Sequence, residues 1–313
     1  MKAVGHAPRA SFGKARLSPP AKKQSRSTHP HYTLVLGGGG ARGLAHIGVL
    51  NVLEREGLLP QLIVGTSMGA IVGGMYAQHP DARALESKIR ALIGSTAFRR
   101  IVLDAFAHDG APDGLRTFSA LYGRVKRGYG FIKSVWSPGI VEVPVLMSFL
   151  SRLLDDRPIE KTAIPFAAVS CEILTGEEVI CRKGSMLKAV AASSAIPGIV
   201  SPVNIEGRFL VDGAPTSMVP VDAARRLSAL PTVAVSVTRP LRADKRVLNA
   251  VDVVLRAGAI ARAQLTEYNL RDARYVLRPR VEAYGWADFH SVGAIISEGE
   301  RTAWEALRAI RAL

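Results

Sequence analysis

The sequence predicts an α/β protein in which a mainly parallel central sheet is flanked by helices, and three observations support this prediction. Short β-prone apolar runs alternate with longer segments whose apolar residues recur at helical spacing. The first two apolar runs each lead through a glycine-containing loop into a helical segment. The chain has 313 residues and 48% hydrophobic content, which is enough to fill the core of one large domain.

The first half of the predicted domain is a β-loop-α-β-turn-α unit, whose two strands should be parallel and joined by a right-handed crossover. Gly57 and Pro60 provide the stop signal for its first helix. The expected elements are a strand at 32–36, a glycine loop at 37–40, a helix at 42–56, a strand at 61–64, a turn at 65–69 and a helix through residue 77.

The second half has weaker signals. Residues 95–145 interleave aromatic and basic side chains without a clean period, so we expect either a cap-like, lipid-contacting insertion or an irregular surface segment. Residues 227–313 should complete the same fold rather than form a second domain. The later elements are expected as strands at 166–170, 179–181, 209–211 and 233–237, and as helical runs through residue 192, at 248–270 and at 291–313.

The formal net charge of +15 is concentrated toward the amino terminus, because no acidic residue precedes Glu54. Residues 1–31 contain too few large apolar side chains to offset ordering entropy, and we expect a disordered basic tail. Three interpretations of this tail are open: a solvated extension, an attachment to phosphate-rich surfaces such as an anionic membrane, or an organelle-targeting peptide. A nucleic-acid partner is not expected.

No run of about 18 uninterrupted apolar residues occurs, and no apolar block of the kind found in secretory signals follows the first basic residues. We therefore expect the main body to be cytoplasmic, with peripheral membrane contact as a further expectation. The two cysteines, Cys171 and Cys181, flank a turn-like segment at 175–177. In a reducing compartment, we expect them to be ordinary strand residues rather than a disulfide.

The pentapeptide at residues 65–69 matches the nucleophile elbow G-x-S-x-G, with Ser67 at its centre. Gly65 and Gly69 would let neighbouring backbone approach closely enough to hold the strained turn and expose the hydroxyl. The pattern alone is weak, but an apolar strand before it and a helix-forming segment after it provide the context that the motif requires.

The glycine run at residues 38–43 satisfies the dinucleotide-binding pattern G-x-G-x-x-G after a strand. That function needs an acidic residue near the end of the second strand, and no Asp or Glu occurs between Gly57 and Pro80. We therefore expect no nucleotide cofactor. Backbone N–H groups at such a loop can instead stabilise an oxyanion.

An activated serine needs a base, because its hydroxyl is a weak nucleophile at neutral pH. Asp212 is the leading candidate, since it ends the apolar run 209–211 and is followed by the small residues Gly213 and Ala214. Standing alone, an Asp-Gly pair is more often a plain turn.

Taken together, four segments in order resemble the patatin-like phospholipase family: the glycine block and helix at 36–50, the elbow at 65–69, a block at 192–198 and the Asp-Gly-Ala block at 212–214. The correspondence covers about residues 34 to 225. Residues 285–289 resemble the tail of the bacterial branch related to neuropathy target esterase. One departure is that residues 215–220 lack the Asn common there in relatives.

The resemblance implies a three-layer patatin-like fold with a catalytic domain at residues 32–226. It also implies a serine hydrolase of lipid or lysophospholipid esters that uses a Ser67/Asp212 dyad without a histidine or a metal. The N–H groups of Gly38, Gly39 and Gly40 would form the oxyanion hole. Arg42 would pin the glycine loop, with Gly43 beside it, and His46 would be a packed helix residue.

Two other classes of function are open at this stage. The first is an ordinary α/β-hydrolase with a Ser67, Asp212 and His290 triad, although that fold normally has several strands before the elbow. The second is a catalytically silent, membrane-binding regulatory module on the same fold.

Overall fold

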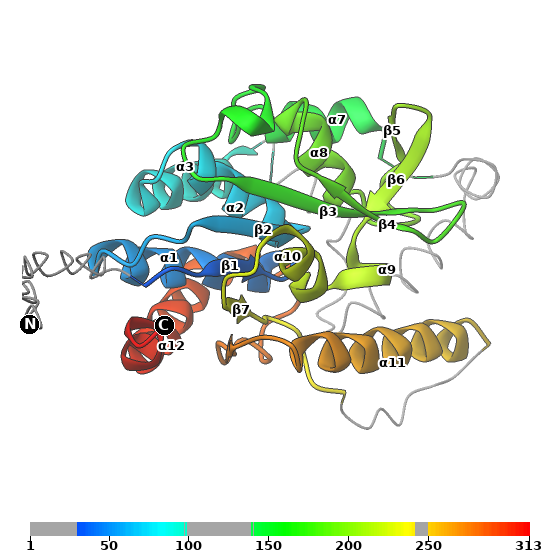
Figure 1. Cartoon of the computed structure of the whole chain (residues 1–313). Coiled ribbons are helices and arrows are strands. Elements are labelled where there is room, and N and C mark those ends of the chain that lie inside the picture. Colours follow the sequence, from blue (N-terminus) through cyan, green and yellow to red (C-terminus); the bar gives the residue numbers. More distant parts are fainter. Residues whose placement is uncertain (1–29, 97, 99–138, 140, 242–249) are drawn as a thin grey trace, which may run out of the picture.

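The computed structural model describes residues 30–96, 98, 139, 141–241 and 250–313 (Figure 1). Almost all of the predicted basic tail and most of the predicted insertion at 95–145 therefore lie outside the described residues.

The described strands form one eight-stranded sheet in the order β5-β6-β3-β2-β1-β7-β8, with β4 paired to β3. Four neighbouring pairs are parallel (β1 with β2, β1 with β7, β2 with β3, and β7 with β8), and the pairs that involve β4, β5 and β6 are antiparallel. The strands are β1 (Thr33–Leu36), β2 (Leu62–Thr66), β3 (Phe166–Glu172), β4 (Glu178–Cys181), β5 (Val203–Ile205), β6 (Arg208–Asp212), β7 (Thr232–Val235) and β8 (Tyr275–Leu277).

Helices cover both faces of this sheet (Figure 1). The α-helices are α1 (Ala45–Arg55), α2 (Met68–Gln78), α3 (Ala82–Gly94), α7 (Val143–Leu150), α8 (Met186–Ser193), α9 (Ala214–Ser217), α10 (Val221–Leu227), α11 (Ala250–Leu270) and α12 (Val292–Arg311). The described residues also form three short 3-10 helices, η1 (Gly40–Leu44), η2 (Ile159–Lys161) and η3 (Phe289–Ser291). The predicted fold class, a mainly parallel sheet flanked by helices, is confirmed.

Strand β1 feeds two separate hydrophobic cores, because successive side chains of a strand point to opposite faces. Leu34 and Leu36 lie in the larger core, which includes apolar residues of α1, α2, α3, α8 and α12. Val35 lies in the smaller core with α10 and the end of α11. A strand buried on both faces explains why residues 33–36 are uniformly apolar or β-branched rather than alternating.

The carboxyl-terminal helix α12 packs across α1 at very close range. A methyl group added at Gly48 would lie 2.0 Å from the Ile296 carbonyl oxygen, and one added at Gly299 would lie 1.9 Å from the Ala45 carbonyl oxygen. Both helices therefore need glycine at the crossing. This contact fixes α1, and with it the glycine loop that precedes α1.

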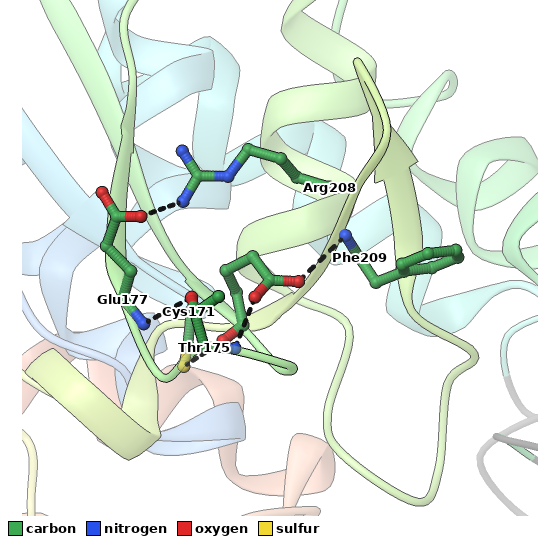
Figure 2. A network of polar contacts seen from close by, with 6 residues as sticks. Cys171, Thr175, Glu177, Arg208 and Phe209 are labelled. Carbon is green, nitrogen blue, oxygen red and sulfur yellow. Dashed lines mark hydrogen bonds and ion pairs between the residues drawn. The ribbon is translucent and has the colours of Figure 1, made fainter.

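The hairpin between β3 and β4 is held to β6 by a network of polar contacts (Figure 2). The buried Glu172 carboxylate accepts hydrogen bonds from the backbone N–H groups of Thr175 (2.6 Å) and Phe209 (3.3 Å). A salt bridge of 2.7 Å joins Arg208 to Glu177 at the surface. The network fixes β6, whose last residue is Asp212, against β3.

Cys171 and Cys181 lie on the two strands of this hairpin but are not opposite each other. Cys171 is paired with Glu178, and Cys181 with Ala168. Both cysteines are free. The prediction that they are ordinary strand residues is confirmed.

Candidate functional site

Ser67 lies at a sharp turn between β2 and α2. Its backbone has φ 55°, a left-handed conformation that is uncommon for a residue with a side chain. The N–H groups of Ala70 and Ile71 both donate to the Ser67 carbonyl oxygen, at 2.8 and 3.0 Å. These bonds begin α2 immediately after the serine. The Ser67 side chain is partly exposed, so the predicted strand-turn-helix context of the elbow is present.

The two glycines of the elbow are required by close backbone approach. A methyl group added at Gly65 would lie 2.5 Å from the Gly69 carbonyl oxygen, and one added at Gly69 would lie 2.1 Å from the Leu36 carbonyl oxygen. The elbow therefore packs directly against itself and against the end of β1. No side chain fits at either position without moving backbone.

Ser193, at the end of α8, clamps the elbow to β3. The Ser67 N–H donates to the Ser193 hydroxyl oxygen at 3.0 Å, and that hydroxyl donates to the Val169 carbonyl oxygen at 2.6 Å. Sequence analysis did not single out this residue. Its only signal was its place in the block at 192–198, because a serine in a small-residue helix carries no local mark of a contact 126 residues away.

The pairing partners of β3 bring Asp212 next to Ser67. Val169 pairs with Thr66 and with Ile180, and the next residue, Ser170, pairs with Asp212 and with Val179. A strand residue has one neighbour on each side, and β4 provides the neighbours on one edge. Strands β2 and β6 therefore meet end to end along the other edge of β3, which places Asp212 beside the residue that follows Thr66.

Asp212 is buried, with 3% of its surface exposed. Burial raises the pKa of its carboxyl group to about 6, although hydrogen bonds from the Ser67 hydroxyl and the Ala214 N–H and the positive charge of Arg262 act in the opposite direction. The Ala214 N–H lies 2.8 Å from Oδ1. A methyl group added at Gly213 would lie 2.5 Å from the Val169 carbonyl oxygen, so glycine is needed there.

The three glycines predicted to form an oxyanion hole are not equivalent. The Gly38 N–H donates to the Met218 carbonyl oxygen at 2.8 Å, and Gly38 is buried. Gly39 and Gly40 are partly exposed, and within the described ranges no acceptor is hydrogen-bonded to their N–H groups. Gly38 lies against the serine, because a methyl group added there would be 3.1 Å from Ser67 Cβ. The Gly38 N–H is therefore already hydrogen-bonded in this structure, and the oxyanion hole at Gly38, Gly39 and Gly40 stays a prediction.

Several polar contacts hold the glycine loop in place. The His46 Nε2 donates to the Gly37 carbonyl oxygen at 2.7 Å, and burial lowers the pKa of this histidine to about 4, so its ring is neutral. Arg42 Nε forms a long hydrogen bond of 3.4 Å to the Gly39 carbonyl oxygen. Both side chains therefore contact the backbone of the loop.

The segment that contains Trp286 also supports the loop. The Ala41 N–H donates to the Trp286 carbonyl oxygen at 2.7 Å. A methyl group at Gly40 would lie 2.2 Å from that same oxygen, and one at Gly43 would lie 2.5 Å from Met68 Cγ. The chain near residue 286 thus presses the loop onto the elbow.

His290 does not join this arrangement. It lies in η3, is exposed, and has no hydrogen bond or ion pair with any other residue that the structure describes. Within the same ranges, no three His, Cys, Asp or Glu side chains gather in a way that could hold a metal ion.

The fold and the elbow define the class of protein: an α/β protein that presents a serine at a strand-to-helix turn, an arrangement used by serine acyl hydrolases. The chain belongs to the patatin-like phospholipase family, whose family model matches residues 34–225. Members of this family are lipid hydrolases.

Two similar proteins are members of families with related names. An uncharacterized NTE family protein of Mycobacterium tuberculosis is 32% identical over 219 residues, which cover 70% of this chain and 52% of that protein. A patatin-like phospholipase domain-containing protein of Caenorhabditis elegans is 26% identical over 303 residues, covering 87% of this chain and 20% of that protein. This chain thus spans about half the length of the first relative and a smaller part of the second.

Among solved structures, VipD from Legionella pneumophila aligns with 90% of this chain and 67% of its own, at 12% identity and a TM-score of 0.40. Similarity at this level supports no conclusion about chemistry.

No helix within the described ranges is both long enough and apolar enough to cross a membrane.

Proposed function

We propose that this protein is a serine acyl hydrolase of lipid esters in which Ser67 is the nucleophile and Asp212 is its base. The proposal is supported by the position of the buried Asp212 carboxylate beside Ser67, whose hydroxyl lowers the pKa of that carboxylate, where β2 and β6 meet along β3. A nucleophile within hydrogen-bonding reach of a base of suitable pKa is the basic requirement of covalent hydrolysis. The assigned substrate class is the phospholipid or lysophospholipid ester.

In the first half of the reaction, Asp212 accepts the proton of the Ser67 hydroxyl while Oγ attacks the ester carbonyl carbon. The carbonyl oxygen becomes an oxyanion. We assign its donors to the N–H groups of Gly39 and Gly40, which follow Gly38 in the loop, are partly exposed and form no other hydrogen bond within the described ranges. Gly38 positions this loop through its bond to Met218.

The tetrahedral intermediate then collapses. The carbon–oxygen bond to the alcohol breaks, and Asp212 returns its proton to the leaving alkoxide oxygen. In the second half, water loses a proton to Asp212 and attacks the acyl carbonyl. Ser67 Oγ then leaves and takes that proton back, which restores the free enzyme.

The environment of Asp212 suits this role. A carboxylate with its ordinary pKa near 4 is a weak base, and burial that raises the pKa to about 6 brings it nearer to neutral pH. It remains mostly ionised at pH 7 and above, so it can accept the serine proton.

The triad alternative is less well supported, because His290 is exposed and has no contact with Asp212 among the described residues. A silent regulatory module would not need the Ser67 hydroxyl to face a carboxylate. We further propose that the protein acts in the cytoplasm and makes peripheral contact with anionic membranes through its basic tail.

The test is labelling with a fluorophosphonate probe, which reacts covalently with activated serines. Wild-type protein should incorporate one probe at Ser67, and Ser67→Ala should lose both labelling and hydrolysis of short-chain p-nitrophenyl esters while remaining folded, since one small hydroxyl is removed. Ser170→Ala is a matched control, because its buried hydroxyl has no hydrogen-bond partner in the described part of the chain. Labelling that persists in Ser67→Ala would contradict the assignment.

A further inference from the structure

Helix α11 lies beside the segment that follows Asp212. It packs against α9, which begins two residues after Asp212, and against α10 (Figure 1). Thr266 and Leu270 on α11 are buried. Because residues four apart share one face of a helix, Arg262 belongs to the same face, one turn closer to the amino end.

Arg262 occupies the position where this face emerges into solvent. Its backbone carbonyl accepts a hydrogen bond of 2.7 Å from the Thr266 hydroxyl, so the turn is well fixed. The residue is exposed overall, while burial of part of it lowers the pKa of the guanidinium and the charge of Asp212 raises it. The positive charge of Arg262 thus lies close enough to act on the carboxylate of the site.

Three arginines on elements near α11 differ from Arg262 because they are paired with acids. Arg225 forms a salt bridge with Asp272, Arg226 forms one with Glu178, and Arg278 forms one with Glu267. Within the described ranges, the Arg262 guanidinium forms no hydrogen bond or ion pair at contact distance. A guanidinium has five N–H donors in a planar fork, which matches a phosphate group in bidentate geometry.

The surface around Arg262 favours a lipid rather than a simple anion. Leu265, three residues after Arg262 and on the same side of the helix, is exposed by 37%. A cation beside an exposed aliphatic side chain is complementary to a molecule with a phosphate next to hydrocarbon.

We propose that Arg262 is a specificity-determining residue that binds the phosphodiester headgroup of a glycerophospholipid or lysophospholipid whose ester carbonyl lies at Ser67. The proposal rests on the hydrolase function proposed above. It adds to that function a reason why the site prefers an ester that carries a phosphate, because a neutral ester gains nothing from the guanidinium.

The experiment compares two substrates of equal acyl chain, 1-acyl lysophosphatidylglycerol and 1-monoacylglycerol, below their micelle concentrations. The pH is 8.5, where Asp212 is ionised with or without Arg262. Arg262→Gln should lower kcat/KM for the lysophospholipid by about tenfold or more, as expected for a lost charge-assisted hydrogen bond, and for the monoacylglycerol by less than about twofold. Arg262→Lys keeps the charge without the fork, so its loss should be intermediate.

Arg308→Gln on α12 is the matched control, because it removes one exposed arginine from a helix that packs on α1. It should leave the ratio of the two kcat/KM values unchanged. Equal losses on both substrates in Arg262→Gln, or no loss on either, would overturn the headgroup role.

A binding measurement separates this proposal from the hydrolase proposal. Dodecylphosphocholine carries a phosphodiester and no ester carbonyl, so calorimetric titration with it does not depend on turnover. Wild-type protein should bind it more tightly than Arg262→Gln, even if neither protein hydrolyses an ester and the hydrolase function fails. Equal binding by the two proteins, or inorganic phosphate binding as tightly as dodecylphosphocholine, would overturn the assignment to a lipid headgroup.

Discussion

The two sides of the site are built by different physical means. On the serine side, the loop before α1 and the elbow before α2 touch through backbone, and added methyl groups at Gly40, Gly65 and Gly69 would lie within 2.5 Å of carbonyl oxygens. On the aspartate side, Asp212 is buried and accepts a hydrogen bond from the Ala214 N–H, and the exposed Arg262 of the neighbouring helix α11 acts on its carboxylate through charge. Backbone contacts thus fix the position of Ser67, whereas burial and the charge of Arg262 determine the pKa of Asp212.

A single methyl group added on the serine side should have the largest effect on stability. Gly69→Ala would place Cβ 2.1 Å from the Leu36 carbonyl oxygen, and neither backbone segment can move without disturbing the elbow. We expect destabilisation of about 5 kcal/mol or more and loss of soluble, cooperatively folding protein.

Gly94→Ala is the matched control, because a methyl group at the end of α3 meets no atom within 4 Å. Its unfolding midpoint in urea should equal or exceed that of wild type. A Gly69→Ala protein with a midpoint close to that of Gly94→Ala would show that the elbow is not fixed by backbone contact.

The raised pKa of Asp212 should make the free energy of unfolding depend on pH. In the unfolded chain Asp212 ionises near pH 4, whereas burial holds its pKa at about 6 in the folded protein. Between these two pH values the folded state binds more protons than the unfolded state does. Ionisation of Asp212 therefore lowers the free energy of unfolding by about 3 kcal/mol as the pH rises from 4 to 7. Below pH 4 the penalty vanishes.

Asp212→Asn removes this titration. Urea unfolding of wild type and of Asp212→Asn at pH 4 and pH 7.5 should therefore show the variant gaining about 3 kcal/mol relative to wild type at the higher pH. A difference between the two proteins that is the same at both pH values would mean that Asp212 is not held in a desolvated environment.

Ser193 joins the elbow to β3, and substitution of Ser193 should have a smaller effect than the changes described above. Ser193→Ala leaves the Ser67 N–H and the Val169 carbonyl without their shared partner, which should cost about 1 to 3 kcal/mol of stability. Because the elbow loosens, kcat for a short-chain ester should also fall.

The adjacent Ser194 offers a direct control, since its buried hydroxyl has no hydrogen-bond partner among the described residues. Ser194→Ala should be neutral or slightly stabilising by the same urea assay. If the two alanine variants behave alike, the Ser193 clamp has no energetic role.

The sequence predicted the serine side well, because its signals are local. Apolar runs, glycines and the elbow pattern lie within residues 32–77, and the structure has β1, η1, α1, β2 and α2 there in that order. The predicted helix at 42–56 begins instead with the 3-10 turn η1, which lets the glycine loop tighten before α1. The short elements β5, β8, α7 and α10 were not predicted, since short segments carry little periodicity. The 13-residue helix α3 was also not predicted, although its buried residues Ala82, Leu85 and Ile89 recur at helical spacing.

The aspartate side could be predicted only as a motif. That Asp212 lies beside Ser67 follows from the pairing of β3 with β2 and then with β6, and such register between distant strands leaves no local pattern. The antiparallel direction of β6 and the placement of Arg262 beside the site are likewise products of tertiary packing. The hydrogen bond from the Gly38 N–H to the Met218 carbonyl oxygen likewise joins two segments far apart in the sequence.

We propose that Asp212 itself is the base. A comparison of Asp212→Asn with His290→Ala in the hydrolysis of p-nitrophenyl butyrate at pH 8 tests this proposal directly. Asp212→Asn removes the proton acceptor that faces Ser67, so kcat should fall by about a thousandfold or more, with the protein folded by circular dichroism. His290 is exposed in η3, just before α12, and should be dispensable, with kcat within about twofold of wild type. A folded His290→Ala protein that loses activity as severely as Asp212→Asn would contradict the dyad and favour a triad.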